Sequence, residues 1–343
     1  MVPRCLTIAG SDSGGGAGIQ ADLKAFAAAG TVSTCASSSL SSRSSQVTAP
    51  VVTSVICDTV PWGDRGALAA EITPVEPDPV STGEGSVLIP RCLTIAGSDS
   101  GGGAGIQADL KAFAAAGCHG MSAVVALTAQ NTVGVVAVHE APPDFIRAQL
   151  EAVFDDLGVD AAKTGMLFSR ESIETVANFL EQHRVPLVVD PVMLASSGAR
   201  LLQDDAVSTL VSRLFPLATV VTPNLGEAEA LTGLSASRRE LAERIHELGA
   251  PAVVVTGGHG PEPIDHLFDG VQHIEIPVAR HEVAATHGAG CTHSATLAAA
   301  LAQGLSLNLA ARAAASVASE AVRNGLMELG AGEGPVDVLG LSA

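Results

Sequence analysis

The stretch Thr286–Ser294 holds residue types that could bind an anion. Gly288 and Gly290 lie one residue apart in it, and glycines let a backbone turn tightly and bring consecutive N–H groups close to a ligand. The apolar run that follows predicts a helix, whose N-terminus combines unpaired N–H groups with the positive end of the helix dipole. We therefore expect the N–H groups of residues 288–291 to cradle a transferring phosphoryl group, with an ordinary glycine-rich helix entry as the alternative.

Strand and helix patterns alternate from Pro90 to the end of the chain, and they must position this cradle. Strands are expected at Cys92–Ala96, Met121–Leu127, Val135–His139, Ala161–Met166, Leu187–Asp190, Thr219–Thr222, Ala252–Thr256, His266–Phe268 and Val271–Ile276. Helices are expected at Ile106–Ala116, Phe145–Leu157, from the Ser169 cap to His183, at Asp204–Leu214, from Ser237 to Gly249, from Cys291 and from about Asn308. This alternation predicts an α/β fold with a mostly parallel central sheet and helices on both faces.

Polar or glycine-rich motifs follow the predicted strands, and ligands of such sheets bind beyond the carboxyl ends of the strands. The motifs are Gly97–Gly105, Thr164–Met166, Asp190–Val192, Thr222–Glu227, Thr256–Gly258 and Gly288–Cys291. Because they recur at corresponding ends of successive strands, we expect them to meet in one site.

Composition excludes several classes of function. The net charge of −18 argues against nucleic acid or an anionic membrane as a partner, and no apolar run reaches the ~18 residues of a membrane span. Six cysteines without a C-x-x-C pair indicate a reducing compartment and no structural zinc. Acidic residues near the N-terminus do not fit a signal peptide, so a cytoplasmic protein is expected.

The segment Pro3–Gly30 recurs without change as Pro90–Gly117. Only the second copy runs directly into the strand and helix pattern, so we divide the chain into a duplicated segment with a linker at 1–89 and an α/β domain at 90–343. Residues 31–89 are rich in serine, proline and glycine, and we expect a disordered linker there, with the β-like run Val51–Cys57 unpaired.

Two familiar phosphate motifs do not explain the chain. It contains no G-x-x-x-x-G-K-[ST] motif. The run from Gly103 to Ala108 satisfies G-x-G-x-x-A, but no acidic residue lies ~20 positions onward to hold a ribose, which disfavours a dehydrogenase.

The chain from Pro90 onward resembles the hydroxymethylpyrimidine/phosphomethylpyrimidine kinases of thiamine biosynthesis, members of the ribokinase-like superfamily. The segments that carry the resemblance are AGSDSGGGAGIQADLKAF, LTAQNT, KTGML, DPVM, TPNLGEAEAL, TGGH and THGAGCT. The sequence departs from the family pattern near Ser100, where proline is common, at Thr256 (lysine), at Ala285 (asparagine) and at Ala289 (threonine).

The resemblance implies an ATP- and magnesium-dependent kinase that acts on a small pyrimidine and forms a homodimer. Cys291 occupies the position at which sugar kinases of the superfamily carry a catalytic aspartate. A helix N-terminus lowers the pKa of a thiol from about 8.5, so a thiolate here could take the proton of the substrate's hydroxymethyl group. The alternative is a small buried thiol that fills space beside Gly288, Ala289 and Gly290.

For the pyrimidine, the resemblance favours Gln130, because a carboxamide matches an amino group beside a ring nitrogen with two hydrogen bonds. An ordinary turn amide is the alternative. Ala104, Met166 and Val192 would line the pocket of the ring. Asp99 would either shape the glycine-rich loop or face the substrate.

For the metal, Asn224 and Glu227 form an N-x-x-E pair on one face of a short helix, where both could hold Mg²⁺ and also cap the helix. Asp190 is a further candidate for that shell. Thr256, Gly257 and Gly258 are expected at the nucleotide. Histidines 259, 287 and 293 lack metal-ligand spacing and are expected to be loop or surface groups.

The activity expected from the resemblance is phosphorylation of 4-amino-5-hydroxymethyl-2-methylpyrimidine, and then of its monophosphate to the diphosphate. A pyridoxal kinase of the same fold and a catalytically silent vitamer-binding protein are the alternatives.

Overall fold

The computed structural model describes residues 4–28, 32–37, 89–194, 198, 201–203, 205–258 and 262–342. The chain divides into a unit of Met1–Ser39 with Ile89–Ala343 and a unit of Leu40–Leu88. The second unit, which contains the run Val51–Cys57, lies outside the described residues, as does His259. No helix within the described residues is long and apolar enough to cross a membrane.

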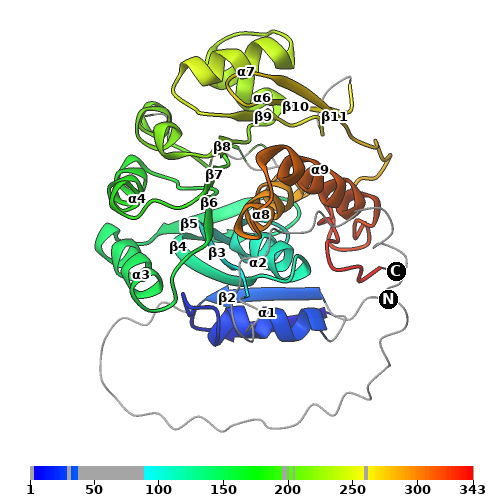
Figure 1. Cartoon of the computed structure of the whole chain (residues 1–343). Helices are drawn as coiled ribbons and strands as arrows, with labels where there is room; N and C mark the ends of the chain where they lie inside the picture. The colour runs from blue at the N-terminus through cyan, green and yellow to red at the C-terminus, as the bar shows by residue number, and fades with distance from the viewer. Residues whose placement is uncertain are drawn as a thin grey trace, which may run out of the picture. The chain divides into compact units, whose positions relative to one another are not determined.

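A sheet of nine strands in the order β11-β10-β9-β8-β7-β6-β3-β4-β5 forms the centre of the domain (Figure 1). Its strands are β3 (Arg91–Asp99), β4 (His119–Gln130), β5 (Val135–Glu140), β6 (Ala161–Thr164), β7 (Leu187–Val189), β8 (Val220–Val221), β9 (Val253–Val255), β10 (Ile264–Phe268) and β11 (His273–Pro277). The neighbouring strands β4, β3, β6, β7, β8 and β9 pair in parallel. Strand β5 at one edge and strands β10 and β11 at the other pair antiparallel. The prediction of a mostly parallel sheet is confirmed.

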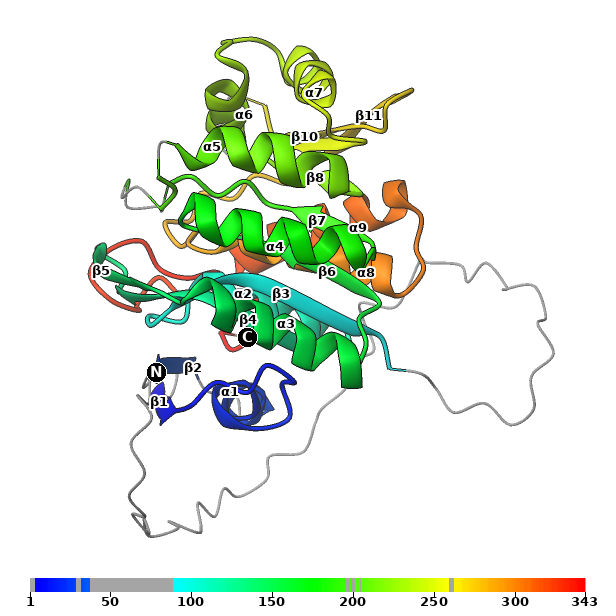
Figure 2. The same ribbon diagram turned by 90° about the vertical axis from the view of Figure 1, so that its left-hand side faces the viewer.

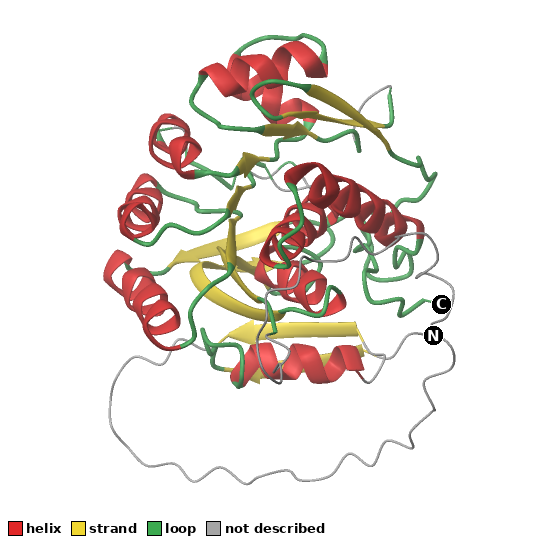
Figure 3. Ribbon diagram, in the orientation of Figure 1, coloured by secondary structure: helices red, strands yellow, loops and turns green. Residues whose placement is uncertain are grey.

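Helices cover both faces of this sheet, as Figures 2 and 3 show. They are α2 (Gly105–Ala115), α3 (Pro143–Asp156), α4 (Arg170–Gln182), α5 (Ala206–Thr209), α6 (Leu225–Thr232), α7 (Arg238–Glu247), α8 (Ala289–Ala302) and α9 (Leu307–Arg323). Alternate strand residues face opposite sides, so Leu93 joins a core with α3, α4 and α7, while Cys92 joins one with α2, α8 and α9. The sheet is therefore packed between two layers of helices.

Local sequence patterns predicted the bounds of most helices and strands to within a few residues of those in the structure. The predicted caps Ser169 and Ser237 are confirmed, since each side chain accepts the N–H of the residue three positions on. The single helix predicted at Asp204–Leu214 is wrong in detail, because α5 continues as a π-helical turn at Leu210–Leu214. Strand β4 is longer than predicted and includes Gln130, because its polar end pairs through the backbone with β5.

The first copy of the repeated segment forms its own small βαβ unit. Strand β1 (Arg4–Ala9), helix α1 (Gly18–Ala28) and strand β2 (Val32–Ser37) follow one another, and β1 pairs in parallel with β2. The expectation that the linker begins at residue 31 is therefore wrong for Val32–Ser37. Strand pairing uses backbone hydrogen bonds, so a serine-containing segment without a strong apolar pattern can still pair once a helical crossover brings it beside β1.

Candidate active site

One cavity of about 770 Å³ opens at the carboxyl ends of the parallel strands. Every residue that the sequence singled out for the site lines it: Asp99, Ala104, Gln130, Met166, Asp190, Val192, Asn224, Glu227, Thr256, Gly257, Gly258, Gly288, Ala289, Gly290 and Cys291. The structure thus brings together groups that are up to 192 positions apart in the chain, from Asp99 to Cys291. This agrees with the rule that the loops beyond parallel strands meet at one edge of a sheet.

The glycine-rich entry to α8 has the geometry of an anion cradle. Gly288 caps the helix with a φ of 86°, a left-handed conformation that favours glycine, and no side chain caps the helix there. The N–H of Ala289 donates to the carbonyl oxygen of Thr286 at 3.0 Å. Among the described residues no backbone acceptor meets the N–H groups of Gly288, Gly290 and Cys291. Three N–H groups, rather than the four expected, are therefore unpaired at this helix N-terminus, an arrangement that suits an anion.

The Cys291 thiol differs from the sequence-based expectation. Burial raises its pKa to about 12, although the charge of Lys163 and the N–H of Gly105 act to lower it. The carboxylates of Asp109 and Asp190 raise it further. The expected lowering by the helix N-terminus is therefore outweighed, and the thiol carries its proton near neutral pH.

A buried charge network that the sequence analysis missed lies behind this thiol. Lys163 of β6 is fully buried, with its Nζ 3.0 Å from Asp109 Oδ1 and 3.8 Å from Asp190 Oδ2. Thr94 donates to Asp109 at 2.6 Å, and Ser294 of α8 donates to Asp190 at 2.8 Å. A lysine in an otherwise small and apolar strand was the available sequence signal, because an unpaired buried ammonium is too costly to tolerate.

Asn224 and Glu227 begin α6 with a full capping box. The Asn224 side chain accepts the N–H of Glu227 at 3.0 Å, and the Glu227 carboxylate accepts the N–H of Asn224 at 2.9 Å. Burial, followed by repulsion from Asp190, raises the pKa of Glu227 to about 8. Two mutually repelling carboxylates beside an amide oxygen suit a cation such as Mg²⁺, which takes one or two protein carboxylates and otherwise water and phosphate oxygens.

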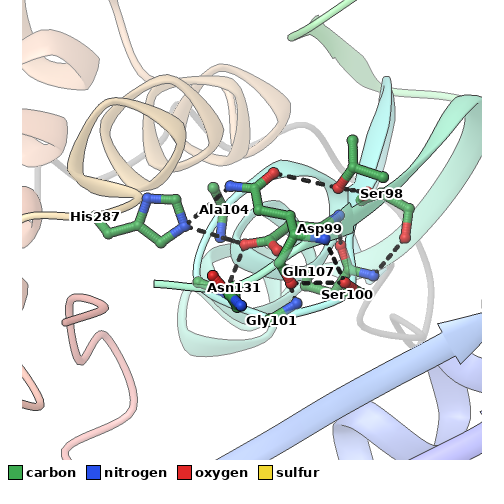
Figure 4. A network of polar contacts seen from close by, with 12 residues as sticks. Ser98, Asp99, Ser100, Gly101, Ala104, Gln107, Asn131 and His287 are labelled. Carbon is green, nitrogen blue, oxygen red and sulfur yellow. Dashed lines mark hydrogen bonds and ion pairs between the residues drawn. The ribbon is translucent and has the colours of Figure 1, made fainter. Parts of the chain in front are cut away.

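Asp99 organises the glycine-rich loop between β3 and α2 (Figure 4). Its carboxylate accepts the N–H groups of Gly101, Gly103 and Ala104 at 2.8, 3.0 and 2.8 Å, and it lies 3.1 Å from His287 Nε2. Burial alone would raise the pKa of Asp99, but the hydrogen bond and charge of His287 and these N–H groups lower it. Of the two predicted roles, the contacts show the first, the shaping of the loop.

Gln130, the last residue of β4, lines the cavity. Its Oε1 lies 3.2 Å from the Thr128 hydroxyl, and its Nε2 lies 3.5 Å from His287 Nε2. Met166, only 7% exposed, lies on the cavity wall, and a Cβ on Gly97 would overlap its methyl group. The amide and the apolar side chain therefore line the same cavity.

The loop after β9 is held by a second buried pair that the sequence analysis missed. The Gly257 N–H donates to Asp265 Oδ1 at 2.6 Å, and Asp265 Oδ2 lies 3.1 Å from His293 Nε2. The N–H of Gly257 is thus already used, and a Cβ there would overlap the backbone of Ile264. The expectation that these histidines are loop or surface groups is wrong for His293, which is buried within α8, whereas His287 does lie in the loop before α8 but is buried there. Local spacing could not reveal partners so distant in sequence.

Comparisons with known proteins agree on the family. The sequence profile of the phosphomethylpyrimidine kinase family matches residues 99–337. A hydroxymethylpyrimidine/phosphomethylpyrimidine kinase from Rhizobium meliloti (strain 1021) is 49% identical over 252 residues, which cover 71% of this chain and 95% of that relative.

Solved structures show the same fold. An ADP complex of Bacillus subtilis pyridoxal kinase is similar with a TM-score of 0.68 and 38% identity, over 74% of this chain and 99% of that chain. Phosphomethylpyrimidine kinase from Clostridium difficile 630 is similar with a TM-score of 0.59 and 40% identity, over 66% of this chain and 96% of that chain. On the match of the profile and the identity to its relatives, the chain belongs to the family of hydroxymethylpyrimidine/phosphomethylpyrimidine kinases.

Proposed function

We propose that the chain transfers the γ-phosphoryl group of ATP to the hydroxymethyl group of 4-amino-5-hydroxymethyl-2-methylpyrimidine, and then phosphorylates the monophosphate to the diphosphate. One observation carries the proposal: the unpaired N–H groups at the start of α8 line the same cavity as Gln130 and Met166. A phosphoryl group on the cradle and a flat ring at the amide would then share one enclosed space. Phosphoryl transfer consists largely of such positioning and of charge stabilisation.

Gln130 is proposed to recognise the pyrimidine. Its carboxamide presents a donor and an acceptor side by side, which match the ring nitrogen and the exocyclic amino group of an aminopyrimidine. Met166, Val192 and Ala104 are proposed to cover the faces of the ring, with the flexible thioether adapting to its shape.

The proposed chemical step is an in-line displacement. The hydroxymethyl oxygen forms a bond to the γ-phosphorus, the bond from that phosphorus to the oxygen of ADP breaks, and the hydroxyl proton passes to the sulfur of Cys291 in its deprotonated, thiolate form. The N–H groups of Gly288, Gly290 and Cys291 stabilise charge on the equatorial oxygens. Because the pKa of Cys291 is raised to about 12, its thiolate is a minor form near neutrality, and the step should accelerate as the pH rises.

The nucleotide and the metal are assigned to the other side of the cradle. Thr256 and Gly258 are proposed to contact the nucleotide, and Gly257 to support that loop through its bond to Asp265. Asp190, Glu227 and Asn224 would hold Mg²⁺, which would neutralise charge on the phosphate oxygens. We further propose a homodimer in the cytoplasm, whose reducing conditions keep the Cys291 thiol free.

Pyridoxal is the rival substrate, because a structural neighbour of this fold is a pyridoxal kinase. The test is ADP release with ATP and Mg²⁺ in the presence of the hydroxymethylpyrimidine, its monophosphate or pyridoxal. We expect turnover with the first two and much weaker turnover with pyridoxal. A preference for pyridoxal would select the rival, and ADP release with none of the three would favour a silent binding protein.

A further inference from the structure

The two copies of the repeated segment provide a comparison within one chain. In the first copy Asp12 accepts the N–H groups of Gly14, Gly16 and Ala17 at 3.0, 3.0 and 2.7 Å. These are the counterparts of the three N–H groups that Asp99 accepts in the second copy. The matching glycines also take the same left-handed conformations: φ is 70° and 56° at Gly15 and Gly18, and 76° and 57° at Gly102 and Gly105.

Further side chains repeat the same contacts. Gln20 accepts the N–H of Asp12 at 2.8 Å, and Gln107 accepts that of Asp99 at 2.9 Å. The Nζ of Lys24 donates to the carbonyl oxygen of Gly15, as that of Lys111 does to Gly102. The loop therefore has the same shape and the same internal contacts in both copies.

The two loops differ in the partner of the aspartate. Asp99 Oδ2 pairs with His287 Nε2 at 3.1 Å, with the two side chains 3% and 10% exposed. Among the described residues no histidine contacts Asp12. In the first loop His119 Nε2 lies 2.7 Å from the carbonyl oxygen of Gly14 instead. Because that loop keeps its shape with no imidazole at its carboxylate, the Asp99–His287 contact is not needed to form the loop. It must serve to join the loop to the element that carries His287.

His287 directly precedes the phosphate cradle, the backbone of residues 288–291 at the start of α8. A Cβ on Gly288 would overlap the carbonyl oxygen of Gly103, so the two backbones touch. The Gly105 N–H also donates to the Cys291 sulfur. The backbone of His287 is fixed from its other side, since its N–H donates to Gly334 and its carbonyl oxygen accepts from Val336.

We propose, on the basis of the kinase function above, that His287 is a positioning residue that locks the Asp99 loop onto the phosphate cradle. The loop bounds the end of the cavity assigned to the pyrimidine, and the cradle bounds the end assigned to the phosphoryl group. The lock fixes the distance between the attacking oxygen and the phosphorus. A displacement of about 1 Å at such a site can lower a rate about 10²-fold while the ligands still bind.

The test compares His287→Ala, His287→Gln and the wild-type full chain. We expect His287→Ala to lower kcat about 10²-fold, with KM for the pyrimidine and for ATP within about threefold, measured at a temperature at which the variant is fully folded. His287→Gln should restore much of kcat, because its amide nitrogen lies the same number of bonds from Cα as Nε2 and can donate to Asp99. A residue that contacted the substrate would raise KM instead.

The repeat supplies a matched control. Asp99→Asn and Asp12→Asn change the same residue in the same local sequence, and only the first should lower kcat. The proposal is overturned if the two variants behave alike, if His287→Ala keeps wild-type kcat, or if its loss follows a lowered thermal midpoint that glutamine does not restore. Failure of the proposed function is a separate result: the wild-type chain would release no ADP with the pyrimidine. The kcat ratios would then be measured on pyridoxal, and the absence of turnover with any vitamer would overturn both proposals.

Discussion

Replacement of Lys163 by methionine tests the buried charge network most directly. The ammonium and the Asp109 carboxylate are both fully buried 3.0 Å apart, and Asp190 lies 3.8 Å from the same nitrogen. The variant Lys163→Met keeps a side chain of similar length but leaves two buried carboxylates without a cation. Removal of one partner of a buried pair costs about 3–5 kcal/mol, a large part of a typical stability of about 5–15 kcal/mol.

The pH dependence of the variant has a definite sign. Burial raises the pKa of Asp109, while Lys163 acts to lower it, so the loss of the lysine raises that pKa further. The folded variant then holds a proton that the unfolded chain releases near pH 3.8. Its stability should therefore fall as the pH rises above that value, by at most about 1.4 kcal/mol per pH unit.

Urea unfolding followed by circular dichroism at pH 5 and pH 7.5 provides the measurement. The double variant Lys163→Met/Asp109→Asn should recover at least half of the lost stability, because it removes the uncompensated charge. Arg239→Ala is the control, since its exposed pair with Glu243 at 3.4 Å should be worth less than about 1 kcal/mol. A loss below about 1 kcal/mol for Lys163→Met, or no recovery in the double variant, would refute the assigned charge balance.

Three further outcomes are expected. Cys291→Ala should lower kcat about 10²–10⁴-fold. The kcat of the wild type should rise with pH without a plateau below pH 9, because the pKa of the thiol is raised to about 12. A flat pH profile would exclude the thiolate as the base. Gln130→Ala should weaken pyrimidine binding by about 1–3 kcal/mol in calorimetry and leave ATP binding unchanged, whereas equal weakening of both would indicate a role in folding. A chain that starts at Pro90 should turn over like the full chain with a slightly lower thermal midpoint. It loses the hydrogen bond that the Ser122 N–H donates to the Ser13 carbonyl oxygen and the one that the Gln20 amide donates to the Ser122 hydroxyl. Loss of activity would place the domain boundary elsewhere.

The sequence was sufficient where local patterns decide structure. Apolar β-branched runs identified the buried strands, as at β7 and β9, and the serine caps located α4 and α7. The rule for parallel sheets then brought the candidate site residues together without any knowledge of their contacts.

Contacts between distant segments could not be predicted in this way. The pairs Lys163–Asp109 and His293–Asp265 each join two elements, and their partners follow from the packing of α2 and α8 on the sheet. The pKa of Cys291 was predicted in the wrong direction for the same reason. The helix N-terminus is visible in the sequence, but the burial and the neighbouring carboxylates that outweigh it are not.

The repeated segment also bears on how the chain folds during synthesis. Strands β1 and β3 have the same core sequence, so β4 and β6, which border β3 in the sheet, could in principle pair with either copy. Translation proceeds from the N-terminus at about 5–20 residues per second. Both copies therefore leave the ribosome before β4 and β6 do, and the second copy is the nearer one along the chain. When β4 and β6 emerge, the second copy is always available beside the first. This order of synthesis therefore disfavours a product in which β1 takes the place of β3 in the sheet.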